Sequence, residues 1–310
     1  MLRSVGGRGY RIGIINPTTL VGKEILSILR ERGFPAEEVR LLDTAGTGDG
    51  VLMEGLSEPL VVRPVDEHEL EGLDLLFCCG SAIEAERWME LRNSHGFIVI
   101  DLTQPSLQKS AGPESVAGLN LEAIDADANL IISPHPITTT LALVLAPIAA
   151  AYEVELCAAT IVEPASALDQ PGIDEMLAQT VAVLNVQTIP KELFDQQAAF
   201  SVYPDSAAVE IEEYVSTQID TVTRGTIPAT IQILKGATFH SHSMSIYLQL
   251  GKDALEEEVS ELLSESSLLS VAEIDESFGT VDAGGRDEIL VSRVRKDPSF
   301  EGGFWIFIVS

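Results

Sequence analysis

Short runs of continuous apolar residues recur through the first 132 residues and constrain the fold of this chain more than any other feature. Each run has the length of a β-strand, and segments with helical periodicity separate several of them. Strands that are buried on both faces show continuous apolar runs, because helices cover both sides of a parallel sheet. The pattern predicts a doubly wound α/β domain over residues 1–132, with these strands: Tyr10–Ile15, Val39–Leu42, Leu60–Arg63, Leu73–Cys79, Gly96–Asp101 and Leu130–Ser133.

The pattern changes in the second half of the chain, where strand-like segments alternate more between apolar and polar residues. Alternation is typical of strands whose two faces meet different surroundings. We therefore predict a second, α+β domain over residues 133–310, with a mixed, largely antiparallel sheet and helices on one face. Its expected strands include Val154–Val162, Ser243–Leu250 and Ile289–Arg295, and its expected helices are Ile173–Leu184, Ile211–Arg224 and Asp253–Leu263.

Charge and composition exclude several classes of function. The chain carries 48 acidic and 19 basic residues, a formal net charge of −29, which repels nucleic acid. No apolar stretch approaches the roughly 20 residues that a membrane span needs, and the N-terminus lacks the apolar centre of a secretory signal. Cys78, Cys79 and Cys157 have no metal-binding spacing and are typical of core residues in a reducing compartment. We expect a cytoplasmic protein.

The turn after the first strand has the place of a dinucleotide-binding turn but few of its glycines. A strand that leads into a helix N-terminus can offer backbone N–H groups to a pyrophosphate when glycines allow close approach. The segment Ile14–Ile25 resembles the strand and glycine-rich turn of the aspartate-β-semialdehyde dehydrogenase family. On that match Asn16 and Thr19 stand at the first two glycine positions, and Gly22 is retained. Pro17 has no N–H to donate.

The resemblance implies a Rossmann-like NAD(P)-binding domain, with NADP or NAD as cofactor, followed by a catalytic and dimerisation domain that forms a homodimer. It assigns the cofactor contacts to Thr18, Thr19 and Gly22, in an altered form. We favour the interpretation that this turn only joins the strand to the helix and binds no ligand. A weakened nucleotide site is the alternative. Asp43 ends the next strand, where it could accept a bond from a ribose hydroxyl or simply close a turn.

The segment Asn129–Ala142 resembles the family's strand, catalytic turn and following helix, but Pro136 stands at the position of the nucleophilic cysteine. In the family, a thiolate at this position attacks the aldehyde, hydride passes to the nicotinamide and the acyl group is released to phosphate. Proline cannot act as a nucleophile. Thr138, Thr139 and Thr140 carry hydroxyls, which are weak nucleophiles without a dedicated base. We interpret these threonines as helix caps.

The family's remaining site positions are altered as well. His242 falls at the acid/base histidine, Lys235 replaces the arginine that binds the substrate carboxylate, and Glu163 replaces the substrate-orienting glutamine. A lysine cannot form the bidentate contact of an arginine, and a carboxylate repels an anionic substrate. Leu107 stands in place of a phosphate-binding arginine. All of these replacements favour a loss of dehydrogenase activity.

Three functions remain open on the sequence. The first is a structural or regulatory paralogue without dehydrogenase activity. The second is an active NAD(P)-dependent oxidoreductase of aspartate-family amino-acid biosynthesis, with chemistry rebuilt around His242, His135 and Thr138. The third is a metal site formed by His135, His240 and His242, although we expect no metal, because retained polar residues without a ligand fit the pattern better. We favour the first.

Overall fold

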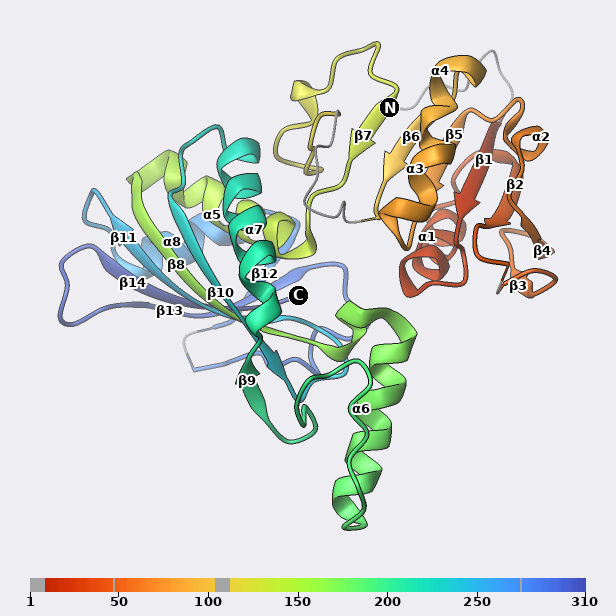
Figure 1. Cartoon of the computed structure of the whole chain (residues 1–310). Helices are drawn as coiled ribbons and strands as arrows, with labels where there is room; N and C mark the ends of the chain where they lie inside the picture. The colour runs from red at the N-terminus through yellow and green to blue at the C-terminus, as the bar shows by residue number, and fades with distance from the viewer. Residues whose placement is uncertain (1–8, 47, 104–111, 274) are drawn as a thin grey trace. The chain divides into compact units, whose positions relative to one another are not determined.

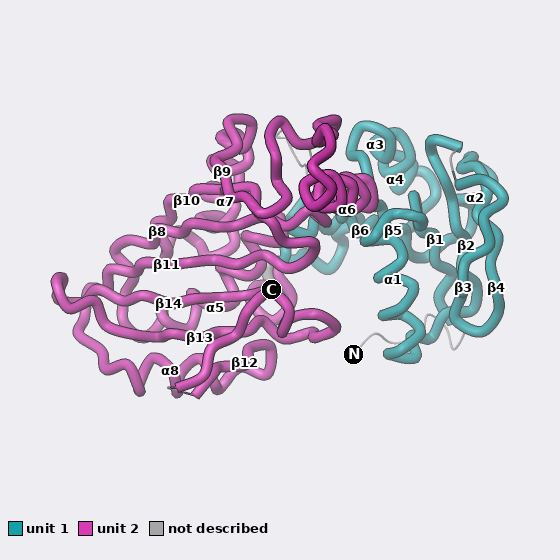
Figure 2. The backbone as a smooth tube through the Cα atoms, turned by 90° about the horizontal axis from the view of Figure 1, so that it is seen from below, with its two compact units in different colours: residues 1–115, 121–134 teal, residues 116–120, 135–310 magenta. Residues whose placement is uncertain are grey.

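The computed structural model describes residues 9–46, 48–103, 112–273 and 275–310, and it divides into two compact units. Unit 1 comprises residues 1–115 and 121–134, and unit 2 comprises residues 116–120 and 135–310 (Figure 2). The sequence predicts a single boundary after residue 132, which assigns residues 116–120 to the first domain. In the structure this short stretch groups with unit 2.

Unit 1 is built around a sheet of order β3-β4-β2-β1-β5-β6-β7. All neighbouring strands are parallel except β3 and β4. The order reverses beside β1, because β2 lies on one side of it and β5 on the other, as in a doubly wound fold. The elements are β1 (Tyr10–Ile15), α1 (Leu20–Glu31), β2 (Ala36–Asp43), β3 (Leu52–Glu54), β4 (Pro59–Pro64), α2 (Glu67–Leu70), β5 (Leu75–Cys78), α3 (Ala82–Glu90), α4 (Arg92–His95), β6 (Ile98–Asp101) and β7 (Leu130–Ile132).

The apolar runs of unit 1 are continuous because the sheet is buried on both faces. Ile12 and Ile14 of β1 pack in one cluster with Leu26 and Leu29 of α1. Ile15 belongs to a separate cluster, which contains residues of β5, α3 and β6. The expected doubly wound α/β domain is thus confirmed, and its first strand has the bounds predicted from the sequence.

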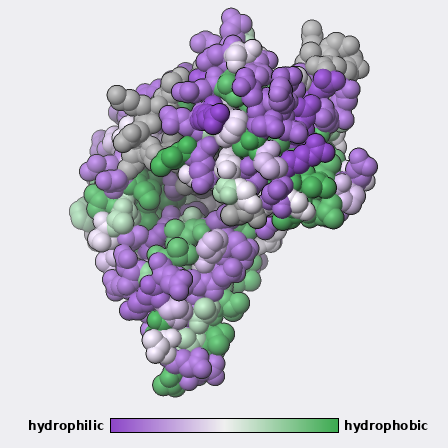
Figure 3. All heavy atoms as spheres, turned by 45° about the vertical axis from the view of Figure 1, so that its right-hand side comes forward, coloured by the Kyte–Doolittle hydropathy of each residue, from purple (hydrophilic) through white to green (hydrophobic). Residues whose placement is uncertain are grey.

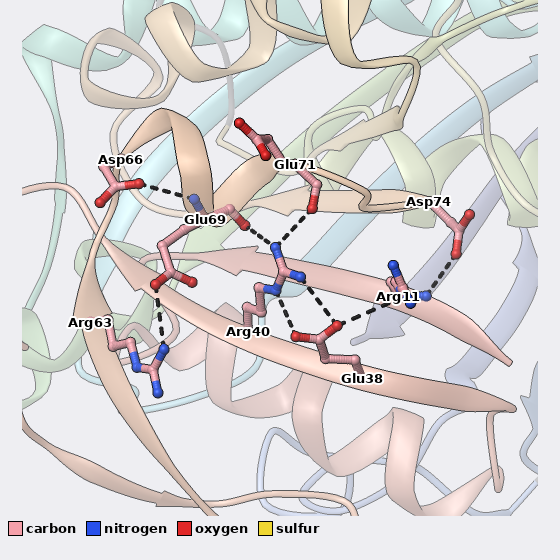
Figure 4. Close-up of polar contacts among 8 residues, drawn as sticks. All are labelled: Arg11, Glu38, Arg40, Arg63, Asp66, Glu69, Glu71 and Asp74. Atoms are coloured by element: carbon pink, nitrogen blue, oxygen red, sulfur yellow. Dashed lines mark hydrogen bonds and ion pairs between the residues drawn. The ribbon is translucent and has the colours of Figure 1, made fainter.

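A network of ion pairs and hydrogen bonds joins β2 of unit 1 to the short helix α2 (Figure 4). The Arg40 guanidinium donates to the Glu38 carboxylate at 2.8 Å and to the backbone carbonyls of Glu69 and Glu71 at 2.7 and 2.9 Å. The hydrogen bond from Arg40 lowers the pKa of Glu38. Since Arg40 satisfies carbonyls at the end of α2, this network caps the helix as well as joining it to the sheet.

Unit 2 has a mixed sheet of order β12-β13-β14-β11-β8-β10-β9. Its neighbours are antiparallel except for the pairs β8–β10 and β12–β13. Helices α5, α7 and α8 lie on one face of this sheet (Figure 1). The elements are α5 (Pro136–Tyr152), β8 (Val154–Glu163), α6 (Asp169–Leu184), β9 (Val202–Pro204), α7 (Val209–Val222), β10 (Ala229–Gly236), β11 (Ser243–Leu250), α8 (Glu256–Ser264), β12 (Leu269–Val271), β13 (Ile289–Lys296) and β14 (Gly303–Val309).

The main core of unit 2 lies between that helical layer and the sheet. Ile137, Leu141 and Leu145 of α5 pack in it against alternate residues of β8, β11 and β14. The predicted α+β domain with helices on one face is confirmed, and alternation is the signal that identified it. No helix in the described part of the chain is both long and apolar enough to cross a membrane.

Helix α6 and the segment that follows it form a separate lobe of unit 2, at the foot of the view in Figure 1. Two buried side chains hold the lobe together. The Glu175 carboxylate accepts from the backbone N–H groups of residues 192–194, and the Gln179 carbonyl accepts from those of residues 198 and 199. Leu177, Val181 and Leu184 are exposed along one side of α6, and apolar surface is visible in this region of Figure 3.

Candidate functional site

The turn that carries Pro136 is the N-terminus of α5. His135 is the N-cap residue, and its Nδ1 accepts from the Ile137 N–H at 3.2 Å. Pro136 follows at the first helical position, where a proline fits because its missing N–H would have no intrahelical partner. Pro136, which the sequence resemblance places at the position of the cysteine nucleophile, is thus an ordinary first residue of a helix.

Two threonines of this helix, Thr138 and Thr140, use their hydroxyls in hydrogen bonds to other side chains. Thr138 is fully buried, and its hydroxyl donates to the Gln218 side-chain carbonyl at 3.0 Å. The same Gln218 oxygen accepts from the His135 N–H at 3.0 Å. The Thr140 hydroxyl donates to the Ser310 hydroxyl at 3.0 Å. The prediction that these threonines cap the helix is wrong, since His135 provides the cap.

Lys235 and Glu163 form a buried ion pair with each other. They lie opposite one another on the adjacent strands β10 and β8, and Nζ of Lys235 donates to Oε2 of Glu163. Oδ2 of Asp205 lies 3.7 Å from the same Nζ. Both members of the pair are at most 9% exposed. Each charge is therefore neutralised within the protein, and the sequence analysis missed this because it treated the two positions separately.

Two histidines share the electrostatic environment of this ion pair. Burial lowers the pKa of His135 to about 4, with Glu163 opposing the shift and His242 and Lys235 adding to it. Burial also lowers the pKa of His242, again opposed by Glu163 and reinforced by Lys235. Both rings are neutral near pH 7. In the neutral His135 ring Nδ1 accepts the capping bond, so Nε2 carries the proton.

We expect the stability of the fold to decrease as the pH falls from about 6.5 to 4, because of His135. The pKa is 6.5 in the unfolded reference and about 4 in the fold, so protons bind the unfolded chain first. The contribution of His135 to the free energy of unfolding is fully present above its unfolded pKa of 6.5. Roughly 3 kcal/mol of that contribution is lost as the pH falls to about 4. His135→Asn removes the titration but retains a side-chain acceptor for the cap.

Urea unfolding of both proteins at pH 7.5 and 4.0, followed by tryptophan fluorescence, measures the difference. The chain has two tryptophans. A Trp88→Phe background leaves Trp305 of β14 as the reporter for unit 2. An equal loss of stability in the His135→Asn variant and its parent would show that His135 is not the group responsible.

The three-histidine metal site receives no support from the structure. The segment after β10 is not extended, because Ser241 has a positive φ of 71°, and His240 is exposed while Nε2 of His242 is buried. Among the described residues there is no group of three or more His, Cys, Asp or Glu side chains arranged to hold a metal ion. The segment that carries His240 and His242 therefore does not present the two rings together, as a shared metal site would require.

The three cysteines lie in the cores of the two units and are fully buried. Burial raises the pKa of Cys157 to about 12 and also raises the pKa of Cys78 well above its usual value. A thiolate is the nucleophilic form of cysteine, so these thiols are held in their unreactive form.

In unit 1, the Asn16 side chain occupies the centre of the first turn. Its amide nitrogen donates to the Cys79 carbonyl at 3.1 Å, and its Oδ1 accepts from the Thr44 N–H at 3.0 Å and from the Thr44 hydroxyl at 2.9 Å. These partners follow β5 and β2, the strands on either side of β1. Asn16 thus joins three strands at their carboxyl ends, where a doubly wound sheet normally binds its ligand. Its backbone has the left-handed conformation that a glycine adopts readily, with φ of 53°.

The other predicted cofactor residues belong to the same turn. Thr19 is the N-cap of α1, and its hydroxyl donates to the Asn16 carbonyl at 2.8 Å while accepting from the Gly22 N–H at 3.1 Å. A Cβ on Gly22 would come within 2.6 Å of Cα of Pro17, so this glycine allows α1 to pack closely on the turn. Thr18 is half-buried beside Gly48.

These residues do not fit a dinucleotide as a glycine-rich turn does. The Asn16 side chain takes up the space at the switch point, Pro17 has no N–H, and the retained glycine serves helix packing. The Asp43 carboxylate accepts from the Gly48 N–H at 3.1 Å, so it closes the following loop. Leu107, at the position of the family's phosphate-binding arginine, lies outside the described residues.

Comparisons with known proteins agree with this two-unit organisation. Residues 11–127 match a family model described as the semialdehyde dehydrogenase NAD binding domain, and residues 145–310 match the semialdehyde dehydrogenase dimerisation domain. An aspartate-semialdehyde dehydrogenase of Prochlorococcus marinus is 25% identical over 94% of this chain and 88% of its own. A Pseudomonas aeruginosa relative named USG-1 protein homolog is 28% identical over 92% of this chain and 87% of its own.

Solved structures show the same likeness over nearly the whole chain. The crystal structure of aspartate semialdehyde dehydrogenase II from Vibrio cholerae matches with a TM-score of 0.91 and 25% identity, and the match covers 98% of this chain and 93% of that one. Because the dimerisation-domain model alone spans more than half of the sequence, the match is not confined to the common nucleotide-binding fold. This chain belongs to the semialdehyde dehydrogenase family.

Proposed function

We propose that this protein is a non-catalytic paralogue of aspartate-semialdehyde dehydrogenase, which acts as a structural or regulatory subunit. One observation carries the proposal: Pro136, which the sequence resemblance places at the family's nucleophile position, is the first residue of α5. The nearest alternative nucleophile along the helix, Thr138, is fully buried and bonded to Gln218. The cysteines are buried in the cores.

The charged positions support the same proposal. An anionic substrate needs an unpaired cation, but the Lys235 ammonium is paired with Glu163 and lies 3.7 Å from Asp205. Breaking this buried pair would leave one charge without compensation, which costs several kcal/mol. The Lys235 charge is therefore compensated within the protein without a ligand.

The first turn supports a loss of nucleotide affinity. Asn16 replaces a glycine and makes three hydrogen bonds to the loops after β2 and β5. A pyrophosphate would have to displace these bonds. NADP or NAD remains the cofactor that the family implies, and we propose that this chain binds it weakly or not at all.

We further propose that the protein forms a homodimer through unit 2, as the matching dimerisation-domain family implies. The exposed apolar side chains of α6, with those of Val186 and Leu193 next in sequence, supply a surface that a partner would cover. A structural or regulatory role needs such an interface even when catalysis is lost.

The proposal predicts a turnover rate for aspartate semialdehyde, with phosphate and NADP or NAD, at least about 10⁴-fold below that of the Vibrio cholerae relative. The loss of the covalent step is the physical reason. Absorbance of the reduced nicotinamide measures the rate. In the matched variant Pro136→Cys, activity is expected to stay low, because the Lys235–Glu163 pair and the Asn16 turn are unchanged.

The second candidate is an active oxidoreductase with rebuilt chemistry around His242. One observation favours it: Nε2 of His242 is buried and has no hydrogen-bond partner among the described residues. A neutral ring nitrogen in that state is available to a ligand. Turnover that is abolished by His242→Gln but unaffected by replacing the cysteines would establish this candidate and refute the non-catalytic proposal.

A further inference from the structure

The helices of unit 2 carry negative charge that no basic residue within them balances. Helices α5, α6, α7 and α8 contain neither lysine nor arginine. Helices α7 and α8 cover the same face of the sheet (Figure 1), and their acidic residues are Glu210, Glu212, Glu213 and Asp220 in α7 and Glu256, Glu257, Glu258 and Glu261 in α8. The acidic excess behind the net charge of −29 is therefore unbalanced in this layer.

The C-terminal ends of α7 and α8 have acidic side chains where basic ones would be favourable. Asp220 lies near the end of α7, Glu265 is the C-cap residue of α8, and neither helix has a basic residue in its last turn. A negative charge there meets the negative end of the helix dipole. Glu257, Glu261 and Glu265 are exposed and four residues apart, a spacing at which like charges repel each other. Only the acidic residues in the first turns are placed favourably.

Ion pairs compensate little of this charge. The pairs in unit 2 include Lys235 with Glu163 and Asp205, which is buried, and Lys296 with Asp253, which is more exposed. None of these carboxylates belongs to α7 or α8. The three exposed carboxylates spaced along α8 form no ion pair within 4.0 Å among the described residues.

The salt concentration decides how strongly such charges repel each other. The Debye length is about 30 Å at 0.01 M salt, about 10 Å at 0.1 M and about 3 Å at 1 M. Side chains four residues apart on a helix are separated by roughly 6 Å, so their repulsion is well screened only near molar salt. The unfolded chain holds the same charges further apart, so the unscreened repulsion acts against the folded state.

We propose that the folded state of unit 2 requires high ionic strength, on the order of 1 M monovalent salt, for its full stability. The inference concerns the fold and does not rest on the proposed loss of catalysis. A surface whose acidity only keeps the protein in solution would instead give a stability that changes little with salt.

Thermal unfolding of the full chain in about 0.05 M and about 2 M KCl tests the proposal. Fluorescence of Trp305 in the Trp88→Phe background reports on unit 2. We expect the Tm to rise by at least about 10 °C between the two salt concentrations. A chain that circular dichroism shows to be unfolded in the lower salt, and folded in the higher, would support the proposal equally.

Two variants separate screening from the general effect of salt on apolar burial. The triple variant Glu257→Gln/Glu261→Gln/Glu265→Gln removes the repulsion along α8 and keeps the helix propensity nearly unchanged. Its Tm should exceed that of the parent by about 3 °C in the lower salt and equal it in the higher. Lys252→Gln, which removes an exposed cation from the same unit, should lower the Tm in the lower salt only.

A Tm that differs by less than about 3 °C between the two salt concentrations would overturn the proposal. So would a gain in the triple variant that persists in the higher salt, because screening removes any gain that comes from repulsion. Light scattering in both salts completes the test. If the Tm rises only where the oligomeric state also changes, assembly explains the rise and the proposal is wrong.

Discussion

Lys235→Met is expected to lower the free energy of unfolding by about 3–5 kcal/mol, the largest effect that we predict for a single substitution. The variant leaves the Glu163 carboxylate buried on β8 without its cation, and Asp205 remains nearby with the same charge. Desolvation of an unpaired charge dominates this cost, because Met fills much of the volume of the lysine side chain. Urea unfolding at pH 7.5 measures the loss.

The double variant Lys235→Met/Glu163→Met is the matched control. Removing both charges together avoids the uncompensated carboxylate, so most of the lost stability should return, to within about 1 kcal/mol of the parent. A loss below about 1 kcal/mol in the single variant would instead resemble an exposed ion pair. That outcome would contradict the buried Lys235–Glu163 ion pair on which the proposed loss of substrate binding rests.

Asn16→Ala is expected to destabilise the fold by about 3–4 kcal/mol. It removes the hydrogen bonds to Cys79 and Thr44, each of which contributes about 1 kcal/mol, and it places alanine at a positive φ. Asn16→Gly is the matched variant, since glycine tolerates that conformation. It should cost about 1 kcal/mol less than Asn16→Ala.

The same glycine variant tests the first turn as a nucleotide site. If the Asn16 side chain is what obstructs a pyrophosphate, Asn16→Gly should bind NADP at least tenfold more tightly than the parent in calorimetry. Equal, tight binding by the parent and the variant would show that Asn16 does not block the turn. Unchanged stability in both Asn16 variants would show that its hydrogen bonds contribute little.

The sequence predicted the elements of this fold well because periodicity reflects burial. β1 has the bounds expected from its apolar run, since both of its faces lie against buried clusters. Alternation in β11 likewise identified a strand with one buried face. These signals are local, and each element shows its own.

The candidate site was harder to predict, because its contacts join residues that are distant in the sequence. Lys235 and Glu163 are 72 residues apart and meet only through the register of β8 and β10. Gln218 lies 83 residues from His135, and nothing in its local sequence marks it as a partner. The wrong assignment of the helix caps could have been avoided, because a proline at the first helical position places the N-cap at residue 135.

We propose that no side chain of this protein attacks the semialdehyde carbonyl. The most direct measurement is the intact mass of the chain after incubation with aspartate semialdehyde and NADP or NAD, with phosphate omitted so that an acyl group would remain attached. The Vibrio cholerae relative serves as the positive control. We predict an unchanged mass for this chain. A stoichiometric increase, mapped to Thr138 or to any of the three cysteines, would contradict the account.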